Sequence, residues 1–198
     1  MENMTTQEAI FTQRFVENGK YGVKDNSGNV LIPAMFDEID DLWAEIYKEC
    51  PSVVWNDGKA GLVSPDGKGT MLVECKYKYG RAIEWSKFYA FQDMDGNWGV
   101  IGSDGKTYVP FKYDSISQDG IGGYIFYEKD GKCGVFAICY DLVTDTIFDN
   151  IIEGAADEYL KMEKDGKEGY VTVDGQFISC EDYEADEEMD VELVGDFY

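Results

Sequence analysis

Pairs of glycines three residues apart recur along this chain, and no other feature restricts its fold as strongly. The pairs are Gly19 and Gly22, Gly58 and Gly61, Gly96 and Gly99, Gly131 and Gly134, and Gly166 and Gly169. The second glycines are separated by 39, 38, 35 and 35 residues. A period of this length is typical of chains that stack copies of one small supersecondary unit. The sequence therefore predicts five structural repeats.

The residues that flank each glycine pair predict a β-hairpin. Asn18, Asp57, Asp95, Asp130 or Asp165 precedes the first glycine. Asn-Gly and Asp-Gly favour the type I′ turn, because both of its central residues need positive φ. Val23, Leu62, Val100, Val135 or Tyr170 follows the second glycine, as expected for a strand. Each copy should thus contain two strands joined by a tight turn.

Two further positions recur behind each hairpin. A second turn glycine lies six residues after the pair, at Gly28, Gly67, Gly105 and Gly175, and the fourth copy has Tyr140 there. An aromatic residue followed by an acid comes later, at Phe36-Asp37, Tyr113-Asp114, Phe148-Asp149 and Tyr183-Glu184. The second copy reaches its aromatic, Tyr77, two residues late. Each unit is predicted as three strands and a variable loop, with the copies at residues 11–40, 52–84, 88–117, 123–152 and 158–186 of one domain spanning 1–198.

The third copy resembles the WG-repeat family. The resemblance rests on Asp95-Gly96-Asn97-Trp98-Gly99-Val100, Asp104-Gly105-Lys106, Val109-Pro110 and Tyr113-Asp114-Ser115-Ile116, and extends from residue 11 to residue 186. The other copies depart from it at the tryptophan, where they have Tyr21, Ala60, Cys133 and Glu168. The resemblance implies an all-β repeat array and no defined chemistry.

Two arrangements of the repeats are compatible with this pattern. Three strands per unit favour an open, twisted superhelix of antiparallel units, because the blades of a propeller usually have four strands. A five-bladed, propeller-like ring is the alternative. Residues 191–198 could form an extra strand that closes the ring or caps the last repeat.

Charge indicates the kind of partner. The chain has 40 acidic and 17 basic residues and a net charge of −23. Such a chain repels nucleic acids and anionic membranes and attracts basic proteins. The tail from residue 181 to residue 198 has nine acids and no Lys or Arg. We expect either a solvated cap or a contact surface for a basic partner there.

Several chemistries lack the residues that they need. The chain has no histidine, no phosphate-binding glycine loop and an odd number of cysteines without a Cys-x-x-Cys pair. These absences argue against histidine-dependent catalysis, zinc and a disulfide framework, so we expect no enzyme, no metal and no cofactor. The stretch from Asp93 to Asn97 resembles a calcium loop only faintly, and paired acids are uninformative where acids are so common. No leader peptide or apolar span is apparent, which favours a cytoplasmic protein.

Binding residues are expected in the variable segments, because the repeated positions build the scaffold. The candidates combine acids with aromatics: Asp40, Asp41, Trp43, Glu45, Tyr47, Trp85, Glu184, Asp186, Glu187 and Glu188. The first hypothesis is a protein-binding module, such as an immunity-type inhibitor that covers the cationic site of a toxin. A carbohydrate or cell-envelope module and a structural scaffold are the alternatives.

Overall fold

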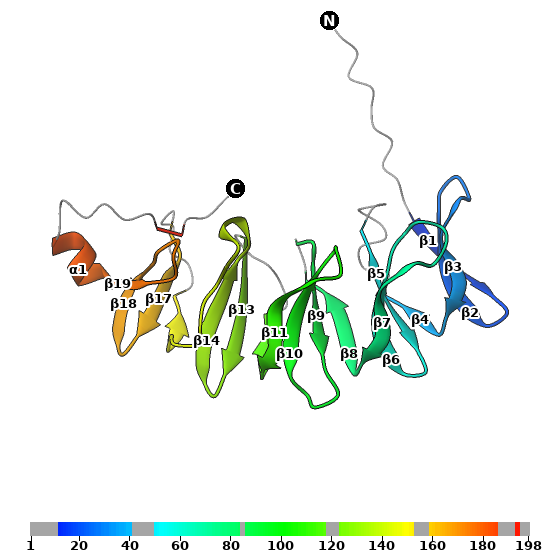
Figure 1. Cartoon of the computed structure of the whole chain (residues 1–198). Helices are drawn as coiled ribbons and strands as arrows, with labels where there is room; N and C mark the ends of the chain where they lie inside the picture. Colours follow the sequence, from blue (N-terminus) through cyan, green and yellow to red (C-terminus); the bar gives the residue numbers. More distant parts are fainter. Residues whose placement is uncertain are drawn as a thin grey trace, which may run out of the picture. The chain divides into compact units, whose positions relative to one another are not determined.

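The fold is all-β, as the repeats predict (Figure 1). The computed structural model describes residues 12–40, 50–83, 86–117, 123–152, 159–185 and 193–194. The short helix α1 (Cys180–Ala185) and a 3-10 helix at Ile138–Tyr140 accompany the strands. None of the sheets formed by these residues closes into a barrel.

The strands form five antiparallel sheets, one for each glycine pair. The first has the order β1 (Thr12–Glu17), β2 (Lys20–Asp25), β3 (Val30–Phe36). The second is β4 (Glu38–Ile39), β5 (Ser52–Asn56), β6 (Lys59–Val63), β7 (Met71–Tyr77). The third is β8 (Tyr79–Ala82), β9 (Phe88–Gln92), β10 (Trp98–Gly102), β11 (Thr107–Tyr113). The fourth is β12 (Ser115–Ile116), β13 (Tyr124–Lys129), β14 (Lys132–Ala137), β15 (Leu142–Val143), and the last is β16 (Asn150–Ile151), β17 (Lys161–Lys164), β18 (Lys167–Val171), β19 (Phe177–Ser179).

Packing divides the chain into two compact units. Unit 1 comprises Met1–Ala82, Lys87–Asp95 and Ile101–Lys106. Unit 2 comprises Ile83–Ser86, Gly96–Val100 and Thr107–Tyr198. The choice between a superhelix and a ring stays a prediction, as does the single domain.

The hairpin turns have the backbone that Asn-Gly and Asp-Gly favour. Asn18, Asp57, Asp130 and Asp165 have φ of 50–52°, and the glycines that follow them have φ of 70–78°. Positive φ at both central residues is the mark of a type I′ turn. The third copy differs: Gly96 has a φ of 94°, Asp95 has no positive φ, and the Asp95 N–H donates to the Asp93 side chain. Its hairpin closes through a turn of another kind.

The second glycine of a pair is required by a close backbone approach. A Cβ on Gly22 would lie 2.6 Å from the Ile32 carbonyl oxygen, and one on Gly61 would lie 2.6 Å from that of Val73. The register shifts at both places, between Tyr21 and Val23 and between Ala60 and Leu62. The third strand of these two repeats therefore bends tightly over a residue without a side chain, whereas a Cβ on Gly134 of the fourth repeat would meet the Tyr127 ring.

Four of the five sheets gain a further strand from the end of the repeat before them. β3 ends at Phe36 and β4 begins at Glu38, yet β4 belongs to the second sheet and pairs with β5 (Figure 1). β8, β12 and β16 join the third, fourth and fifth sheets in the same way. The aromatic-acid step marks the place where the chain crosses from one sheet to the next. After the fifth sheet, Tyr183 lies in α1 instead and packs on Tyr170.

The acid of this step ties consecutive repeats together. Asp37, Asp114 and Asp149 each accept the backbone N–H of the turn residue in the next hairpin, which is Asp57, Asp130 or Asp165. Lys20 also donates to Asp37, and Lys132 to Asp149. In the second copy, Lys78 follows the aromatic residue instead of an acid. The next hairpin is the third one, in which the Asp93 side chain accepts the Asp95 N–H.

The second turn of a repeat packs on the repeat before it. The Gly67 N–H donates to the Leu31 carbonyl oxygen at 2.7 Å, and a Cβ on Gly105 would lie 2.9 Å from the Leu72 oxygen. In the fourth copy Asp141, next to Tyr140, takes the left-handed conformation with φ 51°. The expected turn is therefore kept without its glycine.

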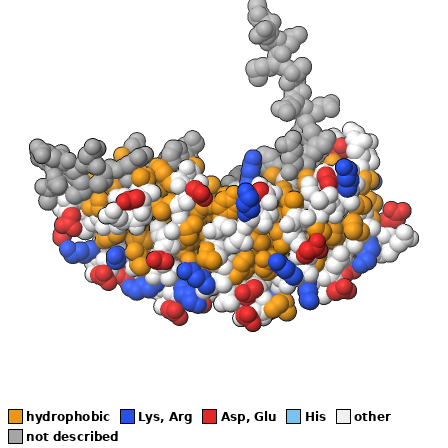
Figure 2. All heavy atoms as spheres, in the orientation of Figure 1, with side chains coloured by type: hydrophobic (Ala, Val, Ile, Leu, Met, Phe, Trp, Pro, Cys, Tyr) orange, Lys and Arg blue, Asp and Glu red, His pale blue; other side chains and the backbone are white. Residues whose placement is uncertain are grey.

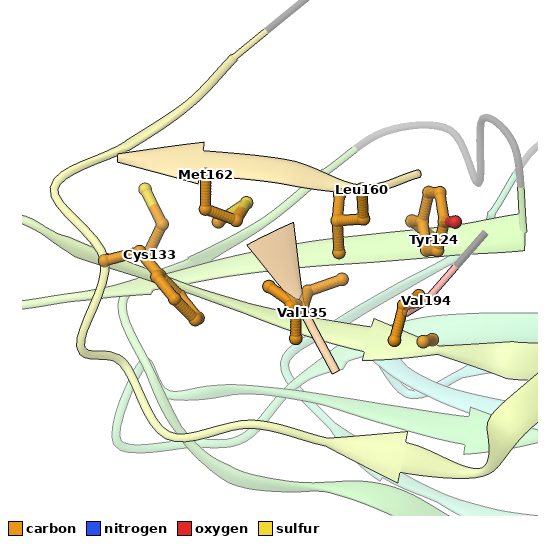
Figure 3. Packing of buried hydrophobic residues seen from close by; sticks show 9 residues of the cluster. Tyr124, Cys133, Val135, Leu160, Met162 and Val194 are labelled. Atoms are coloured by element: carbon orange, nitrogen blue, oxygen red, sulfur yellow. The ribbon is translucent and has the colours of Figure 1, made fainter. Parts of the chain in front are cut away.

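The cores lie between consecutive sheets. In unit 1, one buried cluster joins Val23, Ile32 and Phe36 of the first sheet with Ile39 and Val54 of the second. In unit 2, Val135 of the fourth sheet packs with Leu160 and Met162 of the fifth, and Val194 joins them from the tail (Figure 3). Val194 is held by two backbone hydrogen bonds, one with Leu160 and one with Val171. Residues 193–194 thus cap the core of the last repeat, which is one of the two roles expected for residues 191–198.

Candidate binding surface

Two of the ten predicted binding residues lie in the part of the chain that the structure describes. Asp40 follows β4 and is half-buried, and its backbone N–H donates to the Val53 carbonyl oxygen at 2.9 Å. Glu184 is exposed on α1. The others lie outside the described residues: Asp41, Trp43, Glu45, Tyr47, Trp85, Asp186, Glu187 and Glu188. Asp40 belongs to unit 1 and Glu184 to unit 2.

The excess of acid is concentrated outside the described sheets. Of the 40 acidic residues 24 are described, and of the 17 basic residues 16 are described, which leaves a net charge of −8 on that part. The remaining segments carry 16 acids and one lysine, a net of −15. On the face drawn in Figure 2, basic and acidic side chains alternate rather than separate. The described sheets thus present a mixed surface.

Several acids of the sheets are already engaged within the chain. The hydrogen bond from Lys20, with that from the Asp57 N–H, lowers the pKa of Asp37. The pKa of Asp149 is lowered in the same way by Lys132 and the Asp165 N–H. Hydrogen bonds that stabilise the charged form have this effect. These carboxylates connect repeats, so they are poor candidates for contacting a partner.

Four carboxyl groups and two thiols of the described residues have shifted pKa values. The pKa values of Asp37, Asp66, Asp149 and Asp174 are lowered by hydrogen bonds, whereas a general acid near neutral pH needs a raised pKa. Burial raises the pKa of the Cys75 and Cys133 thiols, which disfavours the reactive thiolate. No group of three or more Cys, Asp or Glu side chains is placed to hold a metal within the described part.

Apolar side chains are exposed in unit 1, where the sequence did not indicate a site. Val16 on β1 is 58% exposed, and Val30 and Met35 on β3 are exposed as well. Val16 lies on the edge of the first sheet, where no strand of the described residues takes the place of the added strand of the other four. Residues 1–18 contain no aromatic residue that is followed by an acid, and that was the available signal in the sequence.

Comparison with protein families supports the resemblance. The model of the WG containing repeat matches residues 21–43 and 98–133. Two stretches of the chain are thus similar to the WG repeat. Each matched stretch begins in the second strand of a hairpin and continues past the aromatic-acid step, so the WG repeat includes the crossing to the next sheet.

No curated protein matches the chain significantly. No helix in the described part is long and apolar enough to cross a membrane.

Proposed function

We propose that this chain is a protein-binding module without catalytic activity, and that its partner is a basic protein. The observation that carries the proposal is the distribution of charge. The described part has 24 acids and 16 bases, a net charge of −8, while the much shorter segments before, between and after the sheets hold a net charge of −15. Charge concentrated in this way speeds association with a cationic surface and selects against anionic ligands.

Inhibition of a basic toxin is the specific form of this function that we favour. Residues 41–49 combine Asp41, Glu45 and Glu49 with Trp43 and Tyr47. Acids would meet the cationic site of an enzyme such as a nuclease, and aromatic side chains supply the anchored contacts that dominate protein interfaces. An inhibitor of this kind needs no chemistry of its own, in agreement with a chain that lacks histidine.

The test is affinity capture with the full chain as bait, at low and at high salt. A charge-reduced variant replaces Asp41, Glu45 and Glu49 with Asn or Gln. Its control makes the same change at three exposed acids of the sheets, Asp95, Asp104 and Glu168. We expect a basic protein that is retained at low salt, released at high salt and lost with the loop variant alone.

The captured protein is then assayed for nuclease or other toxic activity with and without the chain. Recovery of only acidic proteins, or equal retention by both variants, would contradict the proposal. If a basic partner is captured but its activity is unaffected by the chain, the protein-binding function stands and inhibition of a toxin is excluded.

A further inference from the structure

We propose that the outer edge of β1 binds an extended peptide segment of a partner protein, which adds as an antiparallel strand. The segment would carry the sequence aromatic-acid-any residue-aliphatic. This inference rests on the fold and is independent of the proposed function. Its basis is a comparison between β1 and the equivalent strands β5, β13 and β17.

Those three strands are each paired on the edge that β1 leaves unpaired among the described residues. Glu38 pairs with Trp55, Ser115 with Glu128, and Asn150 with Glu163. Trp55, Glu128 and Glu163 lie three residues before the first glycine of their hairpins, as Val16 does. Strand alternation therefore points the backbone N–H and carbonyl of Val16 toward the outer edge. An exposed edge of this kind is a template for strand addition.

The aliphatic residue of each added strand lies opposite one buried position. Ile39, Ile116 and Ile151 pair with Val54, Tyr127 and Met162. These three partners are 0% exposed, and all three face the second glycine of the pair. The same position of β1 is Phe15, opposite Gly22, and it is only half-buried. An aliphatic side chain beside Phe15 would complete its burial.

The acid of the segment has a matching donor. The turn N–H groups of Asp57, Asp130 and Asp165 are each accepted by the carboxylate of the preceding crossing. Asn18 is the equivalent residue of the first hairpin, and no carboxylate of the described residues accepts its N–H. An incoming Asp in the same register would reach this group.

The face of β1 favours a single strand over another repeat or a second copy of the chain. Gln13 and Lys24 are cross-strand partners, and both retain solvent exposure. The equivalent pair of the fourth copy, Ile125 and Phe136, is buried against a neighbouring sheet. A whole sheet packed on this face would bury the Lys24 ammonium, which lies over the Phe15 ring and has no carboxylate partner among the described residues, and burial of such a charge is costly. A peptide needs only the edge.

A labelled peptide tests the proposal on the full chain. Its sequence is that of residues 111–117, Phe-Lys-Tyr-Asp-Ser-Ile-Ser, which supplies the added strand of the fourth sheet. We expect saturable binding by fluorescence anisotropy. Replacing its Asp with Ala should weaken binding, and scrambling its sequence should abolish it.

Two variants locate the peptide. Val16→Pro removes an outward N–H and blocks the edge without interrupting the β1–β2 ladder, because proline is tolerated there. We expect it to weaken binding at least about tenfold. Val16→Thr keeps the strand and should bind like the parent chain. Thermal melting of both variants confirms that they fold.

Three results would overturn the proposal. One is no binding by the full chain. Another is binding that survives Val16→Pro in a folded variant. The third is binding that appears only when residues 2–11 are deleted, since the chain's own N-terminal residues would then be the occupant of the edge.

Discussion

At the scale of single residues, the two glycines of a pair answer different physical demands. Gly58 supplies positive φ in a turn where a Cβ would have open space around it. Gly61 gives room for the backbone of the third strand, which no side chain could share. The sequence predicted both positions from their spacing. The sequence did not reveal why the second glycine is needed, because the close approach involves residues twelve or more positions away.

These two demands predict different costs for the same substitution. Gly58→Ala should destabilise the chain by about 1 kcal/mol, because alanine disfavours the left-handed conformation. Gly61→Ala should cost about 2–3 kcal/mol, because the added Cβ meets backbone that cannot turn aside. Urea denaturation of the two variants measures the difference. Equal costs would contradict the distinction.

The acids of the crossings predict a dependence on pH. The pKa of Asp149 is lower in the folded chain than in the unfolded chain. Its stabilisation is therefore present above the unfolded pKa, near 4, and is lost as pH falls through the folded value. Asp149→Asn should lower the melting temperature at pH 7, and the difference from the parent chain should shrink below about pH 4. A difference that does not change with pH would exclude this role.

At the scale of the element, the added strands were the part that the sequence did not reveal. β4, β12 and β16 each contain two residues, too few for the alternation by which strands are recognised. The hairpins were predictable because their turns need particular residues locally. The crossing was visible as an aromatic-acid pair, but its partner lies in the next repeat and is a matter of tertiary structure.

Although the added strands are short, one side chain in each should contribute strongly to the stability of the fold. Ile39 is fully buried between the first and second sheets. Ile39→Ala should cost about 3 kcal/mol, since it removes buried methyl groups and leaves a cavity. Glu38→Ala, at the exposed neighbouring position of β4, should cost less than about 0.5 kcal/mol. Chemical denaturation compares them, and similar costs would show that β4 is not part of the core.

At the scale of the whole molecule, the repeats separate scaffold from surface. The repeated residues mostly form the turns, crossings and cores, as Asp37 and Asp149 illustrate. The acids and aromatics proposed for binding lie mostly outside the described residues. The sequence could therefore predict where binding residues are sought, but the geometry of a contact depends on side chains whose positions no periodic pattern determines.

Amide hydrogen exchange measured by NMR distinguishes the open edge of β1 from the edges that carry an added strand. Val16, Trp55, Glu128 and Glu163 occupy one position in four hairpins, and only the last three have a partner strand in the described structure. Paired amides exchange slowly because they must open first. We expect the Val16 amide of the free chain to exchange at least about tenfold faster than the other three. Equal protection at all four positions would contradict this expectation.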